Sequence, residues 1–387
     1  MIVGYFGLFD LGIGQALTKI ISEKLSQNKI NDIGKTTWTA ILLMAGFGVI
    51  GGGILYNLSP VIAFSLFKKT PLLQEETTLA FQHLSLTIPI VTTSTCLRGL
   101  LESFQKFEHV NIIKIPMGIS NFLSPMVVSL FTNDLSMIVL PLVVTRVIAC
   151  NGYALFAYKT HPELKKTFTP NITITKELLC FGGWLTISNI IGPVLLYVSR
   201  VMVAIVISAE AVAFYAVPYE IVTKTLILPN MLRTVLFPAF SHDFKTNLKQ
   251  VRKLYRTSIK LLLIILIPTA LMVIFFSKTG LTIWLNPEFS KKSFMVANFL
   301  AVGIVFNSLG LIAQSTIQSY GRPDICAKIH IFELILCVPY TWLLTYQFNV
   351  NGAALAWMIR VIISALILLY IAQKYLNPTR ETLYETT

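Results

Sequence analysis

Residues 258–277 read SIKLLLIILIPTALMVIFFS, a run of mostly apolar residues that decides the class of this protein. A helix needs about 20 such residues to cross the hydrocarbon core of a bilayer. The whole chain has the same character, because 55% of its 387 residues are hydrophobic and only 13% are charged. Ordinary soluble domains have roughly a quarter of their residues charged. A soluble protein of this size cannot bury so much apolar surface, so the composition predicts a membrane protein.

Similar apolar windows recur along the whole chain, and eleven of them qualify as transmembrane helices. The connections between them are short, and even the longest, 233–257, leaves no room for an independent extramembrane domain. We therefore expect an all-α polytopic membrane protein with about eleven spans. The predicted spans are 2–18, 38–58, 80–101, 112–131, 136–157, 178–206, 212–232, 258–277, 293–316, 328–346 and 352–373.

The positive charge of the chain is distributed unequally between alternate loops. There are 31 Lys and Arg residues against 18 Asp and Glu residues, a net charge of +13. Binding to nucleic acid is excluded as the explanation, because it needs a soluble charged face. One set of loops holds 21 of the cations, whereas the other set holds only Lys68, Lys69, Lys278, Lys291 and Lys292. Cytoplasmic loops carry the excess of Lys and Arg, so the C-terminus is predicted to be cytoplasmic.

A weak internal repeat indicates two homologous lobes. Arg146-Val147-Ile148 in the fifth span matches Arg360-Val361-Ile362 in the eleventh, and Asp10 in the first span corresponds to Glu220 in the seventh. Corresponding spans have the same orientation in the membrane, so the repeat is parallel. The sixth span has no partner, which leaves the first lobe one helix short. The predicted lobes are 1–165, with five spans, and 166–387, with six.

Four cations within the predicted spans are candidate substrate contacts: Arg146, Arg360, Lys224 and Arg200. The first three lie near mid-span, and Arg200 lies within two turns of the outer end, where its side chain can also extend toward water. A cation at the bilayer centre costs roughly 2.5–3.5 kcal/mol, so these side chains are expected to face a protein interior or a water-filled cavity. An interior that is net cationic suits an anionic cargo, because guanidinium groups match phosphate oxygens.

Two acidic residues within the spans, Asp10 and Glu220, are candidate sites for coupling to H⁺ or Na⁺. Glu220 and Lys224 are four residues apart on one helical face and can pair, so a purely structural role for them stays open. A helix-packing role for Asp10 stays open as well. The seventh span also carries Pro218 and Pro229, which predict a bent helix that lines a cavity.

Enzymatic motifs are nearly absent from the sequence. It has no Walker A loop, no HExxH and no GxSxG, and its five histidines do not cluster. Its five cysteines show no CxxC spacing, so they indicate neither a disulfide framework nor a zinc site. We therefore expect a transporter without catalytic residues, metal ligands or a cofactor.

Three segments give the sequence its resemblance to a known family. Residues 5–17, YFGLFDLGIGQAL, resemble the second-helix signature of bacterial polysaccharide flippases of the Wzx type, and residues 210–220, EAVAFYAVPYE, with 236–241, LFPAFS, resemble the matching part of the second lobe. Such flippases belong to the multidrug/oligosaccharidyl-lipid/polysaccharide exporter superfamily, with two six-helix lobes. The resemblance implies transport of an undecaprenyl-pyrophosphate-linked oligosaccharide from the cytoplasmic to the periplasmic leaflet of the inner membrane, by alternating access through a central cavity. It also implies membrane lipids, a polysaccharide polymerase and a chain-length regulator as partners.

The sequence departs from the family pattern at two places. The first family helix is missing before residue 1, so either the start is assigned late or the gene is truncated. Ser199 occupies a position where similar proteins have an acidic residue, which removes a neighbouring partner for Arg200. Two alternatives stay open: an ion-coupled multidrug antiporter of the same superfamily, which would want an acidic cavity, and a polymerase or ligase of the same pathway, which would want larger outer loops.

Overall fold

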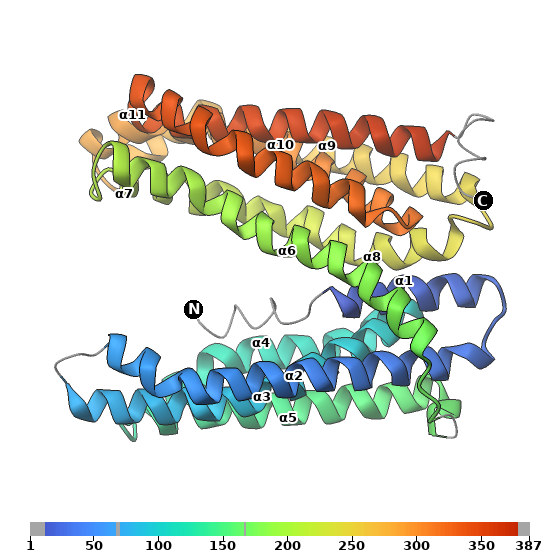
Figure 1. The fold of residues 1–387 in the computed structure, drawn as a ribbon. Helices are drawn as coiled ribbons and strands as arrows, with labels where there is room; N and C mark the ends of the chain where they lie inside the picture. Colours follow the sequence, from blue (N-terminus) through green and yellow to red (C-terminus); the bar gives the residue numbers. More distant parts are fainter. Residues whose placement is uncertain (1–11, 67–69, 166–167, 378–387) are drawn as a thin grey trace. The chain divides into compact units, whose positions relative to one another are not determined.

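The computed structural model describes residues 12–66, 70–165 and 168–377, and no β-strand occurs in these ranges. The chain forms long helices joined by short turns (Figure 1). Their bounds are α1 Ile13–Ser26, α2 Asn31–Leu66, α3 Pro71–Ser103, α4 Phe107–Ser129, α5 Leu135–Thr160, η2 Pro162–Lys165, α6 Ile172–Val206, α7 Val212–Thr223, η3 Lys224–Leu226, α8 Ile227–Asp243, α9 Leu248–Trp284, α10 Pro287–Tyr320 and α11 Pro323–Leu376.

The helices confirm the predicted all-α membrane fold. Among the described residues, eight helices are long and apolar enough to cross a membrane: α2, α3, α4, α5, α6, α9, α10 and α11. Two predicted spans, 328–346 and 352–373, lie within α11, where Asn349 has non-helical backbone angles (φ 56°, ψ −141°) and the chain reverses. The predicted span 2–18 falls largely on residues outside the described ranges, and its last part is the start of α1.

The seventh predicted span is interrupted by a 3₁₀ turn that lies between its two prolines. It consists of α7, the short 3₁₀ turn η3 and the start of α8. Pro218 lies in α7 before the turn, and Pro229 lies in α8 after it. Because a proline cannot donate a backbone hydrogen bond, two prolines eleven residues apart weaken the helical ladder on both sides of η3.

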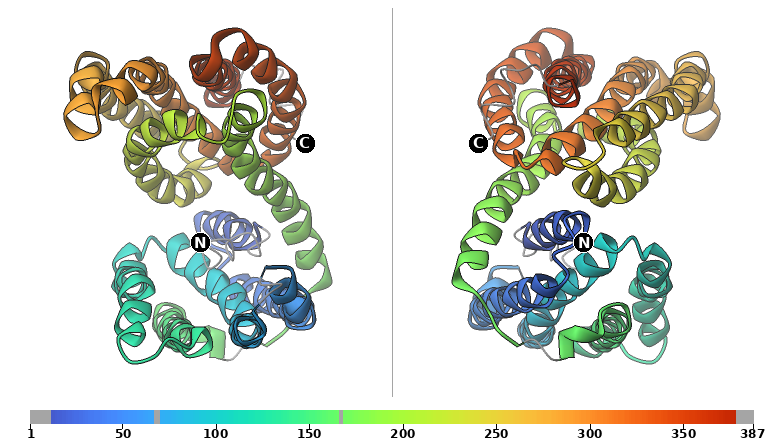
Figure 2. Two further views of the ribbon diagram at one scale, coloured as in Figure 1. Left: turned by 90° about the vertical axis from the view of Figure 1, so that its left-hand side faces the viewer. Right: turned by 90° about the vertical axis from the view of Figure 1, so that its right-hand side faces the viewer.

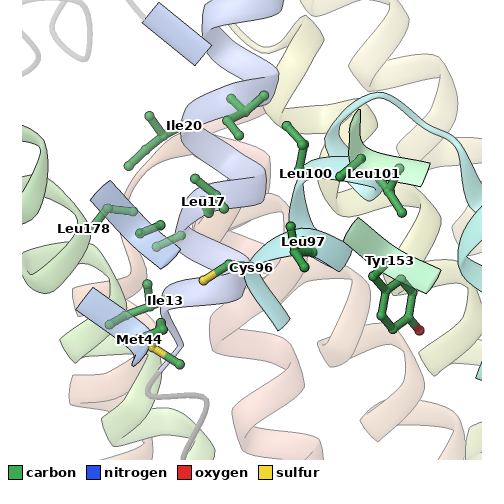
Figure 3. Packing of buried hydrophobic residues seen from close by; sticks show 14 of the residues in the cluster. Ile13, Leu17, Ile20, Met44, Cys96, Leu97, Leu100, Leu101, Tyr153 and Leu178 are labelled. Atoms are coloured by element: carbon green, nitrogen blue, oxygen red, sulfur yellow. The ribbon is translucent and has the colours of Figure 1, made fainter. Parts of the chain in front are cut away.

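The contacts divide the chain into two compact units, Met1–Thr186 (unit 1) and Ile187–Thr387 (unit 2). The sequence placed the division at 165/166, in the loop before α6, but the contacts place it inside that helix. The reason is visible in the core of unit 1, where Leu178 of α6 packs with Leu17 of α1 and Leu100 of α3 (Figure 3). The N-terminal half of α6 is therefore part of the first bundle.

Unit 1 is a bundle in which α3 is the central helix. It packs against α2, α5 and α1, and α4 packs on α5. The end-on views in Figure 2 show these helices running side by side. No residue of α4 other than Val110 is fully buried, so this helix is only partly covered within the unit.

Unit 2 is organised in the same way around α10, which packs against α11, α9, α8 and α7. The close approach of α10 and α11 depends on Gly303, because a Cβ there would overlap the ring atoms of Trp357. Trp357 is 1% exposed and Tyr215 is fully buried, so α7 and α11 share one apolar core with α10.

A bidentate ion pair stabilises the first turn of α11, before the start of the predicted span 328–346. Arg322 donates to both carboxylate oxygens of Asp324, over Nε–Oδ1 and Nη2–Oδ2 distances of 2.9 Å and 3.1 Å. These hydrogen bonds hold the pKa of Asp324 below its ordinary value of 3.8. A carboxyl whose pKa is lower in the folded state stabilises the fold above the ordinary pKa, and this contribution is lost as the pH falls through the folded-state pKa.

We predict that Asp324→Asn lowers the free energy of unfolding at pH 7 by about 0.5–1 kcal/mol, because the pair is partly exposed. The difference between the variant and the parent protein should shrink as the pH falls below 3.8. Thermal melting of the detergent-solubilised protein at a series of pH values measures both effects. A difference that stays constant from neutral to acidic pH would contradict this account of Asp324.

Candidate functional site

Arg200 and Glu220 form a tight ion pair between two helices of unit 2. Arg200 Nη2 of α6 lies 2.6 Å from Glu220 Oε1 of α7. The sequence offers Arg200 no neighbouring acid, because Ser199 stands in the place of one. Helix packing supplies a carboxylate instead, from 20 positions further along the chain. Lys224 also reaches Glu220, but its Nζ lies 4.0 Å from Oε2 and its side chain is largely exposed.

Aromatic rings surround the Arg200 guanidinium. Its carbon lies 4.9 Å from the ring centre of Tyr219 and 5.6 Å from that of Tyr197. Tyr219 also stacks on Tyr215 and meets Trp357 edge-on, with ring centres 5.7 Å and 5.9 Å apart. A guanidinium over aromatic faces is held in one orientation while its remaining N–H groups stay available to an anion.

Arg360 and Glu333 form a second ion pair, within α11. The pair joins the two halves of this helix on either side of Asn349, with Arg360 Nη1 3.6 Å from Glu333 Oε2. Both side chains are only 11% exposed. Near this pair, the hydroxyl of Tyr340 donates to the carbonyl of Ala356, which also connects the two halves. A buried ion pair of this kind is costly to break, because one charge would be left without a partner.

The two pairs belong to one polar cluster in unit 2. The rings connect them, because Tyr219 lies against the Arg200 guanidinium and meets Trp357 edge-on, and Trp357 precedes Arg360 by about one turn of α11. The cluster therefore brings together three of the four predicted substrate contacts, and it contains three cations and two carboxylates among the described residues. We refer to Arg200, Glu220, Lys224, Glu333 and Arg360, with the rings of Tyr215, Tyr219 and Trp357, as the unit 2 cluster.

Arg146, the fourth predicted contact, belongs to α5 of unit 1 and is half-buried. Among the described residues it makes no ion pair, although a polar contact lies beside it: the hydroxyls of Ser120 and Thr145 are 3.0 Å apart. Asp10 lies outside the described residues, so its role and its equivalence to Glu220 stay predictions. Among the described residues, no group of three His, Cys, Asp or Glu side chains could hold a metal ion.

The sequence did not assign Glu333 or the aromatic rings to the site. No helical period connects Glu333 to Arg360, 27 positions away, because the reversal of α11 separates them. Aromatic residues in apolar spans are common as packing residues, so by themselves they do not mark a site. One signal was present, since Tyr215 and Tyr219 are four residues apart, which places them on one side of α7, and Tyr219 directly precedes Glu220.

Comparison with known proteins identifies the family. The sequence profile of the polysaccharide biosynthesis protein family matches residues 2–244. The chain belongs to this family. The profile of the MatE family matches residues 185–343 in addition, which covers much of the unit 2 cluster. Both matches confirm the resemblance to polysaccharide flippases and their superfamily.

Relatives of this polysaccharide biosynthesis protein include a Shigella flexneri protein named as an O-antigen transporter, which is 31% identical over 95% of this chain and 86% of its own length. A Haloferax volcanii protein named as a low-salt glycan biosynthesis flippase is 21% identical over 51% of this chain and 41% of its own length. These names agree with a membrane transporter rather than an enzyme.

Solved structures confirm the fold. A MATE transporter in a bent conformation superimposes with a TM-score of 0.85 at 12% identity, covering 100% of this chain and 86% of the other. A Vibrio cholerae MATE transporter in its bent form gives 0.81 at 15% identity, covering 96% and 85%. At this identity the likeness establishes the architecture, and the cargo must be inferred from the site.

Proposed function

We propose that this protein is a flippase that moves an undecaprenyl-pyrophosphate-linked oligosaccharide from the cytoplasmic to the periplasmic leaflet of a bacterial inner membrane. The proposal is supported by membership in the polysaccharide biosynthesis protein family and by the O-antigen transporter among its relatives. The loop charges support a cytoplasmic C-terminus. A polymerase and a chain-length regulator of the same pathway are proposed partners.

The observation that carries the choice of cargo is the excess of cations in the unit 2 cluster. Arg200 and Arg360 offer planar guanidinium groups, which bind the oxygens of a phosphate in a bidentate way. Each is held by a carboxylate, Glu220 or Glu333, so a pyrophosphate would compete with these carboxylates for the same donors. We propose that Arg146, Arg200, Lys224 and Arg360 contact the pyrophosphate or acidic sugars, along a cationic path for the headgroup.

Coupling to an ion is proposed at Glu220, with Asp10 as its counterpart in the first lobe. A proton or Na⁺ at Glu220 would neutralise the carboxylate that holds Arg200. Arg200 would then be released toward a phosphate, so ion binding and headgroup binding at this pair are coupled through one side chain. A multidrug antiporter is the alternative, and it is disfavoured because cationic drugs require a net acidic site, whereas this cluster holds two arginines whose side chains are only 21% and 11% exposed.

A flipping assay with the purified protein tests the proposed activity. Proteoliposomes would carry a fluorescent polyprenyl-pyrophosphate oligosaccharide, and a membrane-impermeant quencher would report the fraction that reaches the other leaflet. We expect transfer that depends on the protein and responds to a H⁺ or Na⁺ gradient. Uptake of a cationic dye without movement of the labelled lipid would instead identify an antiporter and overturn the proposal.

Arg146 provides an independent test of the cationic path. We predict that Arg146→Ala lowers surface polysaccharide about ten-fold, because about 1.4 kcal/mol of lost cargo binding corresponds to that factor. Arg146→Lys, which keeps the charge, should retain a measurable part of the activity. Immunoblots must show equal protein abundance in all strains. Normal polysaccharide in the alanine strain at normal abundance would remove Arg146 from the path.

A further inference from the structure

A basic cleft occurs at the N-terminal end of α9, away from the unit 2 cluster. It has a volume of about 380 Å³ and is lined by Lys249, Arg252, Lys253, Arg256, Thr257 and Lys260. All of these side chains except that of Arg252 are exposed. Arg252 is half-buried and donates from Nε to the carbonyl of Leu376 at the end of α11. The cleft is therefore built on a fixed helix end and is lined by five cations.

The exposed cations of the cleft lie on one stripe of α9. At 100° per residue, Lys249, Lys253, Arg256 and Lys260 fall within about 40° of a common direction. The opposite face is buried in the core of unit 2, through Val251, Tyr255, Leu262 and Leu266. The buried face thus determines the direction of the cations, which point away from the protein.

This arrangement of like charges is unfavourable by itself. Cations three or four residues apart on a helix repel one another by a few tenths of a kcal/mol for each pair. Among the described residues, none of these four cations forms an ion pair with a carboxylate, in contrast to Lys292, which pairs with Glu288 at 2.9 Å. Orientation in the membrane requires only that cations lie on one side, and it does not require them on one helical face.

The same stripe continues toward the membrane as an apolar surface. Ile264, Ile267 and Leu271 follow Lys260 in the same direction, and they are 70%, 45% and 47% exposed. The stripe from Lys249 to Leu271 is about 33 Å long at 1.5 Å per residue. Its basic part lies at one end, where the headgroup layer is expected, and its apolar part lies along the acyl chains.

We propose that this stripe binds an anionic phospholipid of the cytoplasmic leaflet, with the phosphate headgroup in the basic cleft and one acyl chain along Ile264, Ile267 and Leu271. Charge complementarity supports this occupant, because the cytoplasmic leaflet supplies anionic headgroups beside the helix. A bound phosphate would also relieve the repulsion among the four cations. The site is independent of the transported cargo.

Lipid enrichment around the full-length protein tests the proposal. The protein would be reconstituted in nanodiscs with a minority of phosphatidylglycerol in phosphatidylcholine and re-extracted, and the retained lipids would be quantified by mass spectrometry. We expect retained phosphatidylglycerol to exceed its bulk fraction. The preference for phosphatidylglycerol should be at least about ten-fold weaker in the variant Lys249→Gln/Lys253→Gln/Arg256→Gln/Lys260→Gln. One cation near the membrane surface contributes about a five-fold gain in affinity for anionic lipid, and four are removed.

A matched variant controls for the general loss of charge. Lys29→Gln/Lys106→Gln/Lys114→Gln/Lys159→Gln removes four exposed cations of unit 1 from the same predicted side, and it should retain the preference. The parent protein provides a second readout that needs no variant, because its preference should fall as salt is raised. Equal enrichment in the cleft variant and the parent protein would overturn the proposal. Retention of a polyprenyl pyrophosphate without any preference for phosphatidylglycerol would overturn it as well.

Discussion

Replacing Arg360 by alanine is expected to reduce surface polysaccharide at least about 100-fold and to lower the free energy of unfolding by about 3–5 kcal/mol. The loss of stability follows from Glu333, whose side chain is only 11% exposed in the pair and would be left without its cation. The loss of transport follows from the proposed contact of the guanidinium with the pyrophosphate. Thermal melting in detergent measures the first effect, and quantified surface polysaccharide at equal protein abundance measures the second.

A double variant separates these two consequences. In Glu333→Gln/Arg360→Gln both buried charges are removed together, so most of the lost stability should return, because no unpaired charge remains. Transport should stay lost, because the amide of glutamine cannot replace the guanidinium. Lys292→Gln is the control for an ordinary ion pair, since Lys292 and Glu288 are 52% and 80% exposed, and its effect should stay within about 1 kcal/mol. Full transport by the double variant would show that Arg360 has only a structural role.

Replacing Gly352 by alanine is expected to lower the free energy of unfolding by about 3 kcal/mol, which is large for the addition of a single methyl group. Gly352 lies just after the reversal of α11 at Asn349. A Cβ on Gly352 would overlap the carbonyl group of Leu344 and lie 2.9 Å from the backbone nitrogen of Thr345. Backbone atoms cannot move aside as a flexible side chain can, so the two halves of α11 would have to separate.

Gly280 of α9 provides the matched control for this substitution. A Cβ there would meet nothing within 4 Å, so Gly280→Ala should be neutral or stabilise the helix by about 0.5–1 kcal/mol. The shift in melting temperature of the two variants, measured in the same detergent, gives the comparison. Equal melting temperatures for Gly352→Ala and the parent protein would show that the reversal of α11 tolerates a side chain.

The fold could be predicted from the sequence to a large extent, because a membrane span is determined locally. Residues 258–277 qualify as a helix by their own composition, since every backbone hydrogen bond of a spanning helix is made within the segment. The interruption of the seventh span at η3 also agrees with the positions of Pro218 and Pro229. The division between the units did not, because it depends on which bundle the first half of α6 packs against, and Leu178 decided this by contacts far away in the sequence.

The candidate site shows the same difference between local and tertiary information. The deep cations Arg146, Lys224 and Arg360 could be identified from sequence alone, because a charge inside an apolar window is costly wherever that window packs. Within the unit 2 cluster, the pair that helical spacing predicts, Glu220 with Lys224, is the loose one at 4.0 Å. The tight partner of Glu220, 2.6 Å away, comes from a different helix.

By itself, the sequence determined the membrane class, the positions of most of the spans and the costly charges within them, because each of these follows from the residues of one segment. The tertiary structure alone decided the partners of those charges. Arg200 meets Glu220 only where α6 packs beside α7, and Arg360 meets Glu333 only because α11 reverses at Asn349. Helix packing depends on side chains from several segments at once, so no single stretch of sequence contains that information.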